Sequence, residues 1–182
     1  MNEDDILGLV AADPWMMQVL QAAESLDLPD WMIGAGFLRN KVWDHLHGFI
    51  RPQVDTADID LIYFNPSDTR EETDRIYDSE LHFKVDVNWS TKNQARMHLK
   101  HGDAPYTSST DALAHWVETA TCVAVTLDHG TLKLIAPHGI ADLVDLVLRP
   151  SPAFKNNVRI FDDRVRQHDW LTTWPKLSVV LE

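Results

Sequence analysis

Residues 58–64 read Asp-Ile-Asp-Leu-Ile-Tyr-Phe, and we interpret this stretch as a β-strand that ends at the following Asn-Pro-Ser-Asp. Because successive side chains point to opposite faces of a sheet, Asp58 and Asp60 face the same way. Two like charges on one face are unfavourable unless a cation or water relieves them. Mg²⁺ would relieve them, since it prefers carboxylate and phosphate oxygens. A solvated, acidic strand end is the alternative interpretation.

Upstream of this strand, the short apolar stretch at 31–33 predicts another strand, followed by the turn Gly34-Ala35-Gly36 and a helix over about 37–47. Glycines let the backbone approach a ligand closely, and a helix N-terminus offers free N–H groups and a positive dipole end. Phosphate would bind well there, and Arg39 and Asn40 in the first helical turn are further candidates for contacting it. Taken alone, the motif is also explained as a tight strand-to-helix turn.

Downstream, residues 81–89 alternate between apolar and polar side chains, which predicts a third strand. Asp86 lies in its middle, where aspartate is disfavoured by strand propensity. Lys84 and Asn88 share the face of Asp86, so a Lys84–Asp86 surface pair is one explanation. The functional interpretation makes Asp86 a third carboxylate, beside the two on the preceding strand.

The rest of the chain predicts strands interleaved with helices, and therefore a single α/β or α+β domain over 1–182, with a core at about 31–135 and a helical C-terminal portion at about 137–182. We expect a mixed central sheet flanked by helices. The remaining expected elements are a helix over 14–26 capped by Asp13, a loop over 48–57, helices over 69–79, 91–101, 109–118, 137–148 and 153–168, and a hairpin formed by 121–127 and 131–135.

The predicted helix over 91–101 is the most basic segment of the chain. Lys92 and Arg96 are four residues apart, so they would share one face of that helix. Such a face is either a binding surface for a triphosphate or a solvated surface, and the sequence leaves both open.

One reaction would use all of these features: two carboxylates on one strand, a third on the next, and a glycine turn. Transfer of a nucleotidyl group requires activation of an acceptor hydroxyl and neutralisation of the charge that develops on the phosphate. Two metal ions held by three carboxylates do both, while the protein mainly positions the reactants. Asp86 would also be placed to take the proton of the acceptor, which is a hypothesis.

The sequence resembles the polymerase-β nucleotidyltransferase superfamily, and in particular a small bacterial branch of it. The resemblance runs from Trp31 to Trp174 and rests on four stretches: Gly-Ala-Gly-Phe-Leu-Arg-Asn-Lys-Val-Trp-Asp, Asp-Ile-Asp-Leu-Ile-Tyr-Phe, Trp-Ser-Thr-Lys-Asn-Gln-Ala-Arg-Met-His and Trp-Val-Glu-Thr-Ala-Thr. It implies a polymerase-β-type nucleotidyltransferase fold, and an enzyme that uses Mg²⁺ or Mn²⁺. By position, it also implies phosphate contacts at Gly34 and Gly36 and metal ligation by Asp58, Asp60 and Asp86.

The sequence departs from the superfamily pattern at two places. A serine or second glycine usually follows the first glycine, whereas here Ala35 intervenes before Gly36. The separation of Gly36 from Asp58 is also longer than the common spacing. These departures bear on activity more than on fold.

Charge limits the substrates that we expect. The chain of 182 residues carries a formal net charge of −12 and no secretory signal or long apolar run, so a cytoplasmic protein without a membrane segment is expected. An extended nucleic-acid surface needs the opposite charge, because phosphate neutralisation dominates such binding. The expected partners are a nucleoside triphosphate and an acceptor of unknown kind, whether a small molecule, a protein or an RNA.

The sequence excludes two other nucleotide-binding motifs. A dinucleotide-binding turn needs a third glycine three residues after Gly36, where Arg39 stands, and no Walker motif is present. The expected function is Mg²⁺-dependent transfer of a nucleoside monophosphate to an acceptor hydroxyl. A catalytically silent nucleotide sensor, or a protein-interaction module on the same fold, is the alternative, since a fold does not fix a function.

Overall fold

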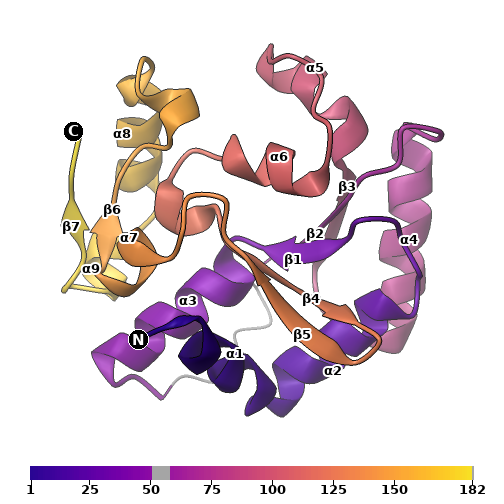
Figure 1. Cartoon of the computed structure of the whole chain (residues 1–182), viewed down its shortest axis with the longest axis horizontal. Helices are drawn as coiled ribbons and strands as arrows, with labels where there is room; N and C mark the ends of the chain where they lie inside the picture. Colours follow the sequence, from indigo (N-terminus) through magenta and orange to yellow (C-terminus); the bar gives the residue numbers. More distant parts are fainter. Residues whose placement is uncertain (51–57, 182) are drawn as a thin grey trace.

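A five-stranded mixed sheet forms the centre of the computed structural model, which describes residues 1–50 and 58–181 (Figure 1). Its strand order is β3-β2-β1-β4-β5. Only β2 and β3 are parallel, and the other neighbours are antiparallel. The strands are β1 (Met32–Gly34), β2 (Ile59–Tyr63), β3 (Trp89–Asn93), β4 (Ala124–Asp128) and β5 (Thr131–Ile135). The mixed sheet between helices confirms the predicted fold class. Most of the loop expected at 48–57 lies outside the described residues.

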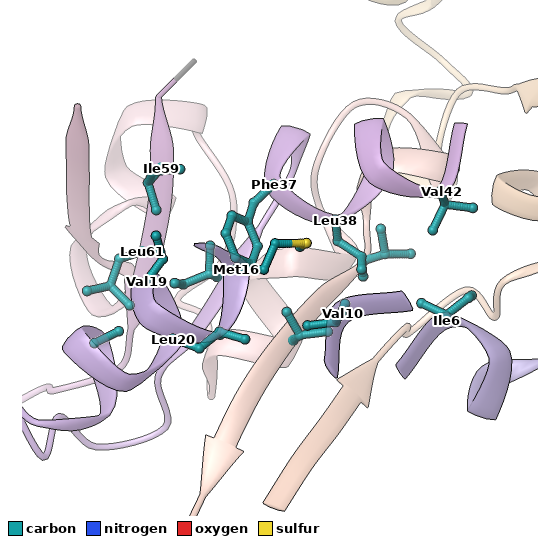
Figure 2. Close-up of a cluster of buried hydrophobic side chains, with 14 of the residues drawn as sticks. Ile6, Val10, Met16, Val19, Leu20, Phe37, Leu38, Val42, Ile59 and Leu61 are labelled. Carbon is teal, nitrogen blue, oxygen red and sulfur yellow. The ribbon is translucent and has the colours of Figure 1, made fainter. Parts of the chain in front are cut away.

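The main hydrophobic core lies between the sheet and three helices, α1 (Glu3–Ala11), α2 (Pro14–Glu24) and α3 (Gly36–His47). Figure 2 shows its centre, where side chains of these helices meet β2; the labelled ones are Ile6, Val10, Met16, Val19, Leu20, Phe37, Leu38, Val42, Ile59 and Leu61. Phe161, Trp170 and Trp174 belong to the same buried cluster, so the C-terminal portion shares this core.

Local sequence signals account for the start of α2 and for the end of α3. The side chain of Asp13 accepts hydrogen bonds from the N–H groups of Trp15 and Met16, and Pro14 opens α2. α3 ends at Gly48, whose φ of 69° lies in the left-handed region that glycine adopts without strain. The helix α1 was not predicted, although Asn2 and Asp5 form a capping box at its start.

In the described part of the chain, no single helix is long and apolar enough to cross a membrane. Among the described helices, α1 and α2 together have the length and composition of a membrane span, but they are bent by 91° relative to each other. Both contribute residues to the buried cluster.

The opposite face of the sheet is covered by the short helix α6 (Ser109–Ala114), as Figure 1 shows. A small second cluster joins Met32, Ile62 and Ala124 of the sheet to Leu113 of α6. Because Asp60 is two residues before Ile62 on the same strand, it shares this face. Asp60 is not in the cluster and borders a cavity instead, so the covered face opens near the start of β2.

The predicted strand over 81–89 is wrong. α4 (Glu71–Lys84) extends five residues beyond the helix expected at 69–79, and β3 begins only at Trp89. Phe83, which the alternation placed on the apolar face, is 90% exposed. Helix electrostatics outweighed the alternation, because α4 has acidic residues in its first turn, His82 and Lys84 in its last, and ion pairs four residues apart.

The predicted helix over 91–101 is wrong in its first half. Residues through Asn93 belong to β3, a short 3-10 helix η1 (Gln94–Arg96) follows, and only α5 (His98–His101) is α-helical. The buried Asn93 side chain donates to the carbonyl oxygens of Asn65 and Asp68 and accepts from the N–H of Ala95. These bonds hold the end of β3 against the segment that follows β2, in a geometry that a continuous helix would not allow.

The C-terminal portion is less helical than expected. The predicted helix over 137–148 reduces to α7 (Ala141–Val144), because Leu146 has a left-handed φ of 59° and the chain then forms a strand. That strand, β6 (Val147–Leu148), pairs in parallel with β7 (Ser178–Val179). The helix expected at 153–168 is divided into η3 (Pro152–Phe154) and α8 (Val158–Gln167); the remaining elements are η2 (Thr119–Thr121) and α9 (Trp170–Thr173).

Candidate functional site

Asp60 lies on β2 between the glycine turn and β3. The antiparallel register pairs Ile33 with Leu61, and one step further along the strands places Gly34 beside Asp60. On the other side, the parallel register pairs Asp60 with Ser90. The fold thus brings the turn after β1 beside the start of β2.

Asp58 is exposed at the start of the same strand and is anchored by Asn88. The side-chain amide of Asn88 donates a hydrogen bond to the Asp58 carboxylate. The carbonyl oxygen of Asn88 accepts from the N–H of Ile59 at 2.8 Å. Asn88 therefore fixes Asp58 just before β2, two residues from Asp60.

Burial, and after it the negative charge of Asp58, raise the pKa of Asp60 to about 6. The positive charges of Arg39, Lys92 and Arg164 act in the opposite direction without cancelling the rise. A carboxylate that is desolvated beside another carboxylate is stabilised by a bound cation. This pair of side chains thus has the electrostatic character of a divalent-cation site.

Asp60 borders a cavity of about 370 Å³. The walls come from the turn before α3, from α5, from η2 and the segment between α6 and η2, and from η3 and α8. The lining residues are Ala35, Asp60, Lys100, His115, Trp116, Val117, Thr121, Phe154 and Arg164. Segments distant in sequence therefore enclose a space large enough for part of a nucleotide next to Asp60.

The turn Gly34-Ala35-Gly36 is closely packed and has a strained backbone. A Cβ at Gly34 would lie 3.0 Å from the ring of Trp116, so the missing side chain lets this ring pack on the turn. Ala35 adopts φ 52° and ψ −128°, a region that favours glycine and is strained for alanine. Strain of this kind is often found where a backbone approaches a ligand. A Cβ at Gly36 would meet the amide of Asn40 at 3.3 Å.

Arg39 is buried and engaged by the protein. Its Nη1 donates to Thr121 Oγ1 at 2.8 Å, and its Nε and Nη2 donate to Asn40 Oδ1. The guanidinium lies 4.5 Å from the ring centroid of Trp170 and 5.0 Å from that of Trp43. Burial lowers the pKa of Arg39 to about 10. Arg39 and Asn40 thus brace the wall of the cavity, and their contact with phosphate stays a prediction.

Lys92 and Arg96 do not share a helix face, and that prediction is wrong. Lys92 lies on β3 opposite Ile62, and its charge lowers the pKa of Asp60. Arg96 pairs instead with the buried carboxylate of Asp74, which also accepts a hydrogen bond from the hydroxyl of Tyr63 at 2.8 Å. Arg96 therefore ties η1 to α4, and Lys92 is the one of the two near the aspartates.

Asp86 lies in the turn between α4 and β3, not within a strand. It is exposed, and its carboxylate is 3.3 Å from Nε2 of His82. Among the residues that the structure describes, no three acidic, histidine or cysteine side chains are gathered to hold a metal ion. The expected meeting of three carboxylates is therefore not found there, because the strand position beside Asp60 is occupied by Ser90.

The sequence interpretation missed an ion pair beside the cavity. Glu118 is fully buried, and its carboxylate binds Nε of Arg164 at 2.7 Å. Glu118 lies within a stretch used for the resemblance, but Arg164 is on α8, 46 residues later, where no local pattern marked it. Only the tertiary packing of the C-terminal portion brings it to Asp60 and Ala35.

Comparisons with known proteins agree with this geometry. A sequence model of the family described as "Nucleotidyltransferase" matches residues 21–179. One similar solved structure is described as "The NMR structure of the protein reveals a CCA-adding enzyme head domain". It aligns with 30% identity and a TM-score of 0.86, over 98% of this chain and 96% of the other. No functionally curated protein matched the sequence.

Two more distant structures are described as "tRNA-processing enzyme (apo form I)" and "tRNA-processing enzyme (apo form 2)". They align with TM-scores of 0.53 and 0.52, both at 20% identity, over 90% and 89% of this chain. This chain spans 42% and 44% of their lengths, and at such identity they show the shared fold alone. The family match over most of the chain, on a fold that pairs two aspartates with a glycine turn, shows that the chain belongs to the nucleotidyltransferase family.

Proposed function

We propose that this protein transfers a nucleoside monophosphate from a nucleoside triphosphate to an acceptor hydroxyl, with Mg²⁺ bound by Asp58 and Asp60. One observation carries the proposal: Asp60 lies on β2 beside the turn that begins α3, and Asp58 directly precedes that strand. Helix N-termini of this kind bind phosphate through free N–H groups. A metal-bound triphosphate would thus have both its cation and its backbone donors at one place.

The residues fit a magnesium ion. Mg²⁺ in enzymes is typically held by one or two carboxylates together with substrate phosphates and water. The pKa of Asp60, raised to about 6 by burial and by Asp58, indicates that the positive side chains nearby compensate the two carboxylates only in part. When bound, the ion would neutralise charge on the phosphates. Mn²⁺ accepts the same oxygen ligands.

The chain's own side chains orient this site. Asn88 holds Asp58 through its amide, and Lys92 adds a positive charge near Asp60. Gly34 and Gly36 flank the turn where phosphate would bind. We leave Asp86 out of the proposed site, because its exposed carboxylate pairs with His82.

The acceptor is proposed to be a small molecule, a protein side chain or the end of an RNA. The related structures are described as a CCA-adding enzyme head domain and as tRNA-processing enzymes, which makes an RNA end one candidate. The net charge of −12 argues against an extended RNA surface on this chain, since such surfaces are basic. Only the acceptor group itself would then need to reach the site.

A nucleotide-binding protein without catalysis is the second candidate. The observation that favours it is Ser90, which stands beside Asp60 where a third carboxylate would complete a two-metal site. Two carboxylates suffice to bind a metal–nucleotide complex but leave fewer ligands for a second ion. Such a protein would bind nucleotide in a metal-dependent way and transfer nothing.

Incubation with each α-labelled nucleoside triphosphate, in Mg²⁺ or Mn²⁺, tests the proposal. The wild type should incorporate label into itself or an added acceptor, and Asp58→Asn and Asp60→Asn should abolish incorporation. Asp163→Asn, which removes an equally charged but exposed carboxylate on α8, should retain it. Metal-dependent binding without incorporation would favour the second candidate, and neither binding nor incorporation would contradict both.

A further inference from the structure

We infer that Arg164, held in place by Glu118, binds the triphosphate of the nucleotide. This inference rests on the proposed function and adds a binding residue from the C-terminal portion of the chain. The cavity beside Asp60 is closed on one side by α8, which supplies Arg164. If the inference holds, the C-terminal portion completes the nucleotide site.

Glu118 fixes the orientation of the Arg164 guanidinium. Oε1 of Glu118 accepts from Nε of Arg164 at 2.7 Å, and Oε2 accepts from Nη2 at 3.5 Å. Glu118 itself is anchored, because its carbonyl oxygen accepts from the N–H groups of Thr121 and Cys122 at 2.9 and 3.1 Å. Since two atoms of the planar guanidinium are bound, the whole group is held in one plane. Its remaining donors are therefore pre-oriented for a ligand.

Arg164 keeps one nitrogen free of acceptors from the described residues. Within residues 1–50 and 58–181, no acceptor binds its Nη1, which is the nitrogen farthest from the Glu118 contact. The side chain is 36% exposed and lines the cavity together with Asp60 and Ala35. A planar pair of N–H groups matches the oxygens of a phosphate.

The charge of the cavity favours an anion. Lys100 and His115 line it with Arg164, whereas Asp60 is its one acidic lining residue in the described part of the chain. Asp60 would be neutralised by the proposed metal ion. A triphosphate would then extend from the metal at Asp60 to Arg164, with a positive charge at each end.

Two pairs of substitutions isolate this role. Glu118→Gln with Arg164→Gln removes both charges of the buried pair, so no unpaired buried carboxylate remains. Arg159→Gln with Asp163→Asn removes an exposed ion pair from the same helix, also without changing the net charge. Thermal unfolding should show both variants folded.

Calorimetric titration with ATP, CTP, GTP, UTP and inorganic triphosphate, in Mg²⁺, measures the effect. The site variant should bind every ligand, inorganic triphosphate included, roughly tenfold or more weakly, as expected for loss of charge-assisted hydrogen bonds. The Arg159/Asp163 control should match the wild type. Unchanged affinity in the site variant, or a loss confined to one base, would overturn the inference.

Arg164→Lys provides a second test that does not depend on folding of the double variant. Lysine keeps a charge beside Glu118 but lacks the planar fork. It should also weaken binding of all five ligands, and wild-type affinity in this variant would contradict the inference. A wild type that binds none of the ligands would instead overturn the proposed function.

Discussion

Asn88 joins β3 to the start of β2 through a hydrogen bond from its side-chain amide to the carboxylate of Asp58. This amide lies directly before β3, in the region where the carboxylate of Asp86 was expected to join those of Asp58 and Asp60. Asp58 is therefore oriented by a neutral donor, and its charge remains available for a cation.

Asn88→Ala should lower nucleotidyl transfer, because groups that orient a metal ligand typically contribute about 10- to 100-fold to metal affinity or activity. The expected change is an increase of the Mg²⁺ concentration needed for half-maximal activity. Asn156→Ala, at an exposed position before α8, serves as the control. An Asn88→Ala variant with wild-type Mg²⁺ dependence would show that this hydrogen bond has no functional role.

Stability should depend on pH through Asp60. Its pKa rises from 3.8 in the reference state to about 6 in the fold, so the folded protein binds the proton more tightly. The protonated side chain is favoured on folding. The resulting stability is therefore present below about pH 4 and is lost as the pH rises through about 6. The loss amounts to at most about 3 kcal/mol, by the conversion of pKa units to free energy.

Urea unfolding of the wild type and Asp60→Asn between pH 4 and pH 7 measures this effect. Relative to the wild type, the variant should gain stability as the pH rises, because asparagine carries no charge to bury. Mg²⁺ at pH 7 should stabilise the wild type more than the variant. A difference between the two proteins that does not change with pH would contradict the assigned environment of Asp60.

Ala35→Gly should stabilise the protein by about 1 kcal/mol, because glycine adopts the observed φ of 52° and ψ of −128° without strain. Ala22→Gly, in the last turn of α2, should instead destabilise it by about 1 kcal/mol or more, since glycine weakens a helix and the buried methyl group of Ala22 is lost. Chemical denaturation of both variants makes the comparison. If Ala35→Gly were as destabilising as Ala22→Gly, the turn would not have the described conformation.

Asp86→Asn should reduce transfer far less than Asp58→Asn, because Asp86 is exposed and paired with His82. Turnover of labelled nucleotide under identical Mg²⁺ concentrations compares the two. Equal loss in both variants would restore the original expectation that Asp86 is a third carboxylate of the site.

The glycine turn and the first two aspartates could be predicted from sequence, because each depends on neighbouring residues. Strand alternation alone puts Asp58 and Asp60 on one face, and the step from strand to helix at 31–47 follows from local pattern. The structure adds the strand register, which sets Gly34 beside Asp60.

The position of Asp86 could not be predicted, because the pattern of residues 81–89 fits both a strand and the end of a helix. Their alternation suggested a strand, yet Leu81 completes the buried side of α4 while Phe83 is exposed. The contact of Glu118 with Arg164 depends on how α8 packs, which no local signal encodes.

A crystal structure with Mn²⁺ and a non-hydrolysable nucleoside triphosphate tests the central claim most directly. Anomalous scattering should locate the ion between the carboxylates of Asp58 and Asp60, with the phosphates next to Ala35. An ion bound elsewhere, or a nucleotide bound away from β2, would contradict the account.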